Sequence, residues 1–249
     1  MKRVSLKETG IEDIKCFDWV EYFKYNNAHL IPLDYSLNNE LNRGQKRLIF
    51  PSIKAFQIGE GSDGAHLTSV VKAFAEKTEY PEFPEIMKWF IVEENRHSQM
   101  LKAYLEAYGE ECEKSLWIDN IFRSLRKLMG IECEVIVLVT AEMIALSYYD
   151  ALADATDSVL LKDICAQMLH DELMHIVLQS DTLNRISSGR AEFFNTISRA
   201  IRKILMSVTS SVVWKKYKDV FIKAEYTKKD FKENCKFYLN QSISIEKKI

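Results

Sequence analysis

Two short stretches of the 249-residue chain repeat one arrangement of side chains that bind metals. The first contains Glu94 and His97, and the second contains Glu172 and His175, at the same spacing of three residues. Residues three apart project from nearly the same side of a helix, so each pair offers one carboxylate oxygen and one imidazole nitrogen to a single ion. The repeat therefore predicts two metal ions held by a helical chain.

A dinuclear site of this kind needs two further carboxylates, one on a helix before each pair. Glu60 and Glu142 meet this requirement, because each stands alone among apolar residues of helical period. Several buried carboxylates without cations would cost several kcal/mol each, whereas two divalent ions balance four carboxylates. The predicted metal ligands are Glu60, Glu94, His97, Glu142, Glu172 and His175. We expect Glu94 and Glu172 to bridge the ions and Glu60 and Glu142 to be terminal ligands.

An acid stands directly before each motif glutamate, Glu93 before one and Asp171 before the other. A histidine that binds a metal usually donates its second ring N–H to a carboxylate. We therefore predict that Asp171 orients His97 and that Glu93 orients His175. The alternative is that both acids face solvent.

Other side chains near these motifs leave alternatives open. Asp63 lies one turn from Glu60 and is either an extra or substitute ligand or a surface acid. Tyr149 lies two turns after Glu142 and is either a core residue or a redox-active tyrosine. We expect the remaining candidates to be structural or solvated: His29, His66, His170, Cys165 and Gln179.

The rest of the chain favours long helices. Only 8 Gly and 4 Pro are present, and 47% of the residues are hydrophobic, which indicates an all-α protein with a buried core. We predict one domain over 1–249, built on a ferritin-like four-helix bundle at about 52–186, with a long crossover at 110–130 that contains a short helix. The expected bundle helices are Ser52–Lys77, Pro84–Tyr108, Ile131–Ala155 and Ser158–Ile186. Flanking helices are expected at about 11–29 and 190–240, including one over Arg190–Trp214, a short one after Thr227 and a frayed tail from Gln241.

Composition argues against several classes of protein. A net charge of −2 gives no signature of nucleic-acid binding. No stretch has the ~20 apolar residues needed to span a bilayer, and the N-terminus lacks the apolar run of a signal peptide. Five cysteines without a Cys-x-x-Cys motif indicate reduced thiols. We expect a cytoplasmic protein without a transmembrane segment.

The two motifs resemble known di-iron proteins. Glu93–His97 (EENRH) resembles the corresponding element of soluble acyl-carrier-protein desaturases, and Asp171–His175 (DELMH) resembles the second element of the wider ferritin-like di-iron carboxylate superfamily. Residues 53–105 also resemble small bacterial ferritin-like proteins. The resemblance implies that the six predicted ligands hold two iron ions, with manganese as the alternative metal and dioxygen as the co-substrate.

Two departures from that family limit what the resemblance implies. Met174 stands where many second motifs carry arginine, and Ala145 and Leu146 stand where desaturases and monooxygenases often place a threonine. The missing threonine leaves the proton-delivery step of those enzymes without its residue here. A rubredoxin-like Cys-x-x-Cys module is also missing from the chain.

The expected function is an oxygen-activating di-iron oxidoreductase that acts on an apolar small molecule or acyl group and receives electrons from a ferredoxin or reductase. The side chains expected to line its pocket are Phe56, Phe90, Leu101, Leu138, Met168 and Ile176. One alternative is a ferroxidase or a rubrerythrin-like peroxide scavenger. The other is a metal-stabilised binding protein that contacts a membrane or acyl carrier through basic residues at 199–203 and 215–218. The oligomeric state stays open, with a homodimer among the options.

Overall fold

The computed structural model describes residues 3–6, 17–38, 40–61, 64–78, 80–112 and 130–246. Across these ranges the regular structure consists of eight α-helices and no strand, so the prediction of an all-α protein is confirmed. The helices are α1 (Trp19–Ala28), α2 (Arg43–Glu60), α3 (Ala65–Thr78), α4 (Phe83–Ala107), α6 (Gly130–Ala155), α7 (Val159–Ser187), α8 (Glu192–Lys223) and α9 (Lys228–Glu246).

The chain packs as two compact units. The first unit comprises Met1–Lys15, Val135–Thr156 and Met168–Ile249, and therefore holds most of α6 and α7 together with α8 and α9. The second unit comprises Cys16–Glu134 and Asp157–Gln167, and therefore holds α1 to α4 with the first turns of α6 and α7. The prediction of one domain over 1–249 stays a prediction.

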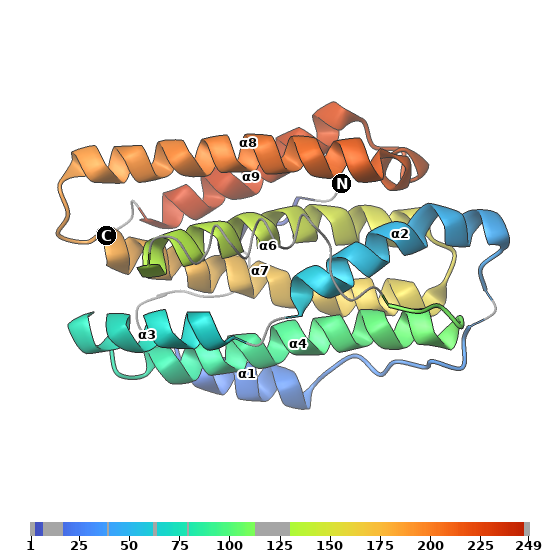
Figure 1. Ribbon diagram of the computed structural model, residues 1–249, viewed down its shortest axis with the longest axis horizontal. Coiled ribbons are helices and arrows are strands. Elements are labelled where there is room, and N and C mark those ends of the chain that lie inside the picture. Colours follow the sequence, from blue (N-terminus) through green and yellow to red (C-terminus); the bar gives the residue numbers. More distant parts are fainter. Residues whose placement is uncertain are drawn as a thin grey trace. The chain divides into compact units, whose positions relative to one another are not determined.

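In the second unit, α4 is the central helix, and α1, α2 and α3 pack against it (Figure 1). The side of α4 that they cover carries large apolar side chains such as Phe83, Phe90 and Tyr104, which are almost completely buried. Burial of such side chains contributes about 1.5–3 kcal/mol each. This packing holds the ligand-bearing middle of α4 in one orientation.

The predicted helix Ser52–Lys77 is wrong, because two helices occupy this part of the chain. The first, α2, begins nine residues earlier, where Asn42 and Gln45 form a capping box in which each side chain accepts the other's backbone N–H at 3.0 and 2.9 Å. It ends at Glu60. Gly64 then adopts a φ of +65°, and a Cβ there would lie 2.6 Å from Ile91 of α4. The helix breaks because only glycine allows this backbone conformation and this close contact.

In the first unit, α8 and α9 lie side by side (Figure 1). Polar contacts join α9 to α6 as well: the Asn234 amide donates to Ser147 Oγ at 3.0 Å, and the thiol of Cys235 lies 3.8 Å from the same oxygen. Burial raises the pKa of the Cys235 thiol to about 12, so this group stays protonated.

The start of α7 belongs to the second unit. This helix begins after Ser158, whose Oγ accepts the Leu161 N–H at 3.2 Å as an N-cap.

Two predicted boundaries outside the predicted bundle are also wrong, those of α8 and of the tail. The first predicted helix is not continuous over 11–29, because Asp18 is the N-cap of α1, which begins at Trp19. The helix α8 continues to Lys223, past a kink at Tyr217, instead of ending at Trp214. The expected frayed tail is helical as far as Glu246, because α9 buries Phe231, Tyr238 and Leu239. The predicted crossover helix falls largely in 113–129, outside the described residues, as does the start of the first predicted helix.

No helix in the described ranges combines the length and the apolar character that a bilayer span requires.

Candidate metal centre

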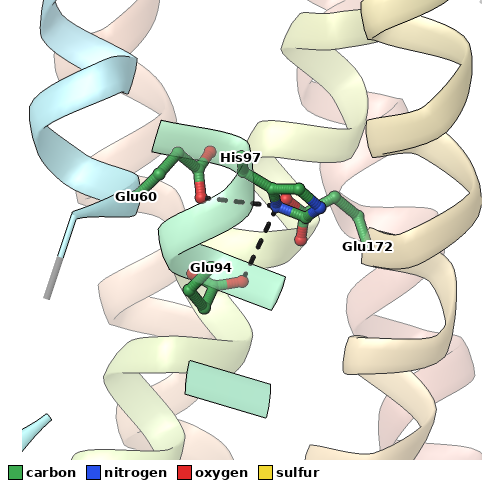
Figure 2. A group of neighbouring side chains, drawn as sticks. All are labelled: Glu60, Glu94, His97 and Glu172. Carbon is green, nitrogen blue, oxygen red and sulfur yellow. Dashed lines mark ion pairs between the residues drawn. The ribbon is translucent and has the colours of Figure 1, made fainter. Parts of the chain in front are cut away.

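The second unit brings three predicted ligands together, and we call them the Glu60 half-site: Glu60, Glu94 and His97. Glu60 is the last residue of α2, and the other two come from the middle of α4. The Nδ1 atom of His97 lies 4.0 Å from Glu60 Oε2 and 3.9 Å from Glu94 Oε1. Figure 2 shows the two carboxylates converging on the same ring nitrogen from two helices.

A short polar link positions Glu60 against α4. The hydroxyl of Ser98 donates to the carbonyl oxygen of Gln57 at 2.8 Å and accepts from the Gln57 side-chain amide at 2.9 Å. Ser98 is the next residue after His97, and Gln57 is one turn before Glu60. The link therefore joins the last turn of α2 to the ligand-bearing turn of α4.

Glu93, the acid before Glu94, is completely buried and held by two polar partners in the same unit. Its Oε1 accepts from the Asn26 amide of α1 at 2.6 Å and from the Arg96 guanidinium at 2.9 Å. Arg96 also donates to Asn27 at 3.1 Å. The alternative that Glu93 faces solvent is excluded by its burial. Asn26 and Arg96 are site-adjacent residues that sequence analysis did not select.

The first unit brings together the other three predicted ligands, which we call the Glu142 half-site: Glu142, Glu172 and His175. Glu142 lies in the middle of α6, and the motif pair lies in the middle of α7. His175 Nδ1 is 3.5 Å from Glu172 Oε2. In each half-site, one candidate ligand atom per residue can be chosen so that all three lie within 4.8 Å of one another.

Gln179 supports the Glu142 half-site. Its side-chain amide donates to Glu142 Oε1 at 3.0 Å, and the residue is 1% exposed. It stands one turn after His175 on α7, so the helix spacing of the motif continues through it. We predicted a structural role for Gln179, and the structure shows that it contacts a predicted ligand. Its spacing of seven from Glu172 was the available signal.

Both half-sites have the chemistry of a metal site. Carboxylate and imidazole are ligands for iron, manganese and zinc, and protein ligands lie about 2.0–2.2 Å from such ions. Two ligands of one ion are therefore about 3 to 4 Å apart, which matches the separations of 3.5 to 4.0 Å between nitrogen and oxygen in the half-sites. These buried clusters of Glu and His can bind a metal ion.

The structure also places the weaker candidates. His66 lies 3.1 Å from the buried carboxylate of Glu134. Tyr149 is fully buried in α6. His29 and His170 are exposed, and Cys165 is buried in α7. Asp63 lies outside the described residues.

Asp171 is also completely buried, so neither motif acid faces solvent. The prediction that Asp171 orients His97 and Glu93 orients His175 stays a prediction.

Comparisons of the chain with family models, curated proteins and solved structures gave no match.

Proposed function

We propose that the two half-sites hold one iron ion each, and that the two ions form the centre of an oxygen-activating di-iron oxidoreductase. One observation carries the proposal. Each unit separately brings a glutamate from one helix and a Glu-x-x-His pair from another into a buried cluster. The same donor set, built twice from different helices, is what a two-metal carboxylate site requires.

Charge balance supports two ions. The half-sites contain four carboxylates that are between 0 and 8% exposed. Buried carboxylates are costly unless cations neutralise them or their pKa values rise until they are protonated. Two divalent ions balance the four carboxylates, and the two imidazoles are neutral, so the assembly has no net charge. No lysine is therefore needed among the six ligands to neutralise the carboxylates.

The choice of iron rests on the resemblance of the two motifs to di-iron proteins. Iron supplies one-electron chemistry with dioxygen when bound. The chain's own residues have three tasks. The carboxylates and the imidazole Nδ1 atoms hold the ions. Two of the carboxylates are oriented by hydrogen bonds, Glu60 through the Ser98–Gln57 pair and Glu142 through Gln179. The surrounding helices exclude water. The bundle proposed for this task is a ferritin-like arrangement of α2, α4, α6 and α7.

An apolar molecule or acyl group is the proposed substrate. Of the six side chains expected to line its pocket, five are buried and Phe56 is half-buried. An apolar surrounding suits an apolar substrate and keeps charged competitors out. Electrons are proposed to come from a ferredoxin or reductase, and the cytoplasm is the proposed location.

Reconstitution with iron tests the proposal. The purified chain is loaded anaerobically with ferrous iron, exposed to air, and analysed for iron content and magnetic coupling. We expect two irons per chain and a coupled ferric pair, because ions of a two-metal site are about 3.5–4 Å apart. Two uncoupled irons would show separate mononuclear sites and overturn the proposal. Many irons per chain would instead indicate iron storage.

Substrate-dependent oxygen use separates the proposed oxidoreductase from a ferroxidase. With a ferredoxin and its reductase present, an apolar acyl substrate should increase oxygen consumption and yield an oxidised product. A ferroxidase would consume oxygen in proportion to added ferrous iron alone. The same preparation carrying His175→Ala is the control, since it keeps the helices but lacks one ligand.

A further inference from the structure

One face of α8 exposes a continuous row of large apolar side chains. These residues are between 37 and 70% exposed and follow one another along five turns of the helix. They are Phe193, Phe194, Ile197, Ile201, Ile204, Val208 and Val212, and we call them the α8 stripe. Single exposed apolar residues are common, whereas a continuous row of seven marks an interaction surface.

The stripe has the spacing of one apolar face of a helix. From Phe194 to Val208 the apolar positions alternate steps of three and four residues. This spacing keeps the side chains in one row along α8. Such a row is able to pack along a partner helix, as in coiled coils.

The charges within the stripe segment are poorly placed for an anionic membrane, although Lys215, Lys216 and Lys218 follow it on α8. Between Phe193 and Val212, its cations are Arg199, Arg202 and Lys203, and it has no acid. Arg202 is 1% exposed and donates to Ser242 of α9 at 2.7 Å, while Arg199 forms an ion pair with Glu192. Two of the three cations are thus engaged within the chain and are poorly placed to bind lipid headgroups.

Small uncharged residues lie next to the stripe instead. Ala200, Ser207 and Ser211 stand among the stripe residues on the outward side of the helix. Small side chains let two helix backbones come close. An identical stripe is the complementary surface for such a face, since a two-fold contact matches a patch with itself.

The area of the stripe is sufficient for a dimer. Its side chains are 37 to 70% exposed. At ~150–200 Å² for a fully exposed large apolar side chain, they present on the order of 600–700 Å², which is at or above the upper end for a patch on a monomer and close to the ~800 Å² that each partner contributes to a standard interface. We propose that the α8 stripe binds the α8 stripe of a second copy of this chain, and that the protein is a two-fold symmetric dimer. This proposal is independent of the metal site.

The test is the solution mass of the full chain by light scattering and sedimentation. The wild type should have about twice the 29.0 kDa mass of one chain. Ile204→Glu, at the centre of the stripe, should weaken association by about 100-fold or more, because it places a charge in the middle of a helix pair. The matched control is Ile222→Glu. Ile222 is also on α8 and is 57% exposed, but it lies beyond the kink at Tyr217.

Each outcome decides the proposal. A dimer that Ile204→Glu converts to a folded monomer, with Ile222→Glu still dimeric, supports it, with circular dichroism reporting the fold. A wild-type monomer overturns it. A dimer that survives Ile204→Glu also overturns it, since another surface must then be the interface. Binding of a monomer to phosphatidylcholine–phosphatidylglycerol vesicles, lost in Ile204→Glu, would overturn it in favour of a membrane.

Discussion

The two half-sites share a donor set but differ in where it stands along the helices. The Glu142 half-site lies in the middle of two long helices, and its three residues are 0 to 3% exposed. In the Glu60 half-site, one ligand is the last residue of a helix, and Glu60 and Glu94 are 6 and 8% exposed. Continuous helix on both sides of a ligand restrains it more than a helix end does, because helix ends fray.

Their supports differ in the same direction. A direct side-chain bond from Gln179 restrains the carboxylate of Glu142. Glu60 is instead positioned indirectly, through the Ser98–Gln57 link one turn away. We infer that the Glu142 half-site is the rigid anchor and that the Glu60 half-site is where metal and small ligands exchange. The four predictions below test this difference, from the largest expected effect to the smallest.

Removal of a histidine ligand should have the largest effect. His175→Ala should lower the iron affinity of the Glu142 half-site by more than ~100-fold, beyond the usual loss for an outer-shell partner, and His97→Ala should do the same for the Glu60 half-site. Each variant should retain about half of the wild-type iron after gel filtration. His66→Ala is the control and should keep full loading, because His66 contacts Glu134. Loss of all iron from either variant would show that the half-sites cannot be compared as separate ligand sets.

Asp171→Ala should reduce iron affinity by roughly 10–100-fold, the usual effect of losing a carboxylate that orients a metal-binding histidine. Asp171 is fully buried, so a water molecule could take the place of its carboxylate only at a cost in free energy. Iron titration with a competing chelator measures the change. Asp163→Ala, two turns earlier on α7, is the matched substitution and should leave the affinity unchanged. Equal iron affinities in the two variants would show that Asp171 does not orient a metal-binding histidine.

Gln179→Leu should lower the iron affinity of the Glu142 half-site by roughly 10-fold, at the lower end of the range for residues that contact a metal ligand. The reason is that Glu142 loses the amide that restrains it. The matched variant is Gln167→Leu on the same helix. It also loses a hydrogen bond, to the Ile31 N–H, but should change stability only. Chelator-driven release of iron distinguishes them: Gln179→Leu should release its anchored iron as fast as the exchangeable one. Unchanged release would show that Gln179 does not create the asymmetry.

Ser98→Ala should have the smallest effect. Two hydrogen bonds to Gln57 are lost, each with a net contribution of about 0.5–1.5 kcal/mol, so the free energy of unfolding should fall by about 1–3 kcal/mol. Iron affinity should fall only a few-fold and only at the Glu60 half-site. Ser52→Ala, which removes a local bond within α2, is the control. Urea unfolding and the iron titration together give both numbers, and a loss at the other half-site would contradict the comparison.

Local patterns in the sequence predicted the helices α4, α6 and α7 to within a residue or two. The Glu-x-x-His spacing, the apolar stripes and the Ser158 cap depend on residues one or two turns apart, so the sequence contains them directly. The same reasoning selected the residues of both half-sites. It also separated His66 from them, but for a reason that does not hold, because His66 lies on α3 and Glu60 on α2.

Long-range contacts account for what the sequence could not predict. Gly64 ends the predicted helix because it packs on Ile91, which is distant in the chain. Asn26 and Glu93 are 67 residues apart, and no spacing rule connects them. The long helix α9 was predicted as short because its many lysines obscured the apolar residues that it buries. The exposure of the α8 stripe could not be predicted, since a sequence pattern cannot show that a face lacks cover.

The end of α2 at Glu60 has an electrostatic consequence. The aligned peptide dipoles of a helix place about half a negative charge at its C-terminus. Glu60 is the last residue of α2, so its carboxylate lies within this negative field, whereas Glu142 lies far from either end of α6. A cation near such a helix end gains typically 0.3–1 kcal/mol, and up to ~2 kcal/mol where the site is partly buried. The dipole would therefore partly offset the weaker restraint of the Glu60 half-site. The two ions would also differ in reduction potential, with the more oxidised state favoured beside Glu60.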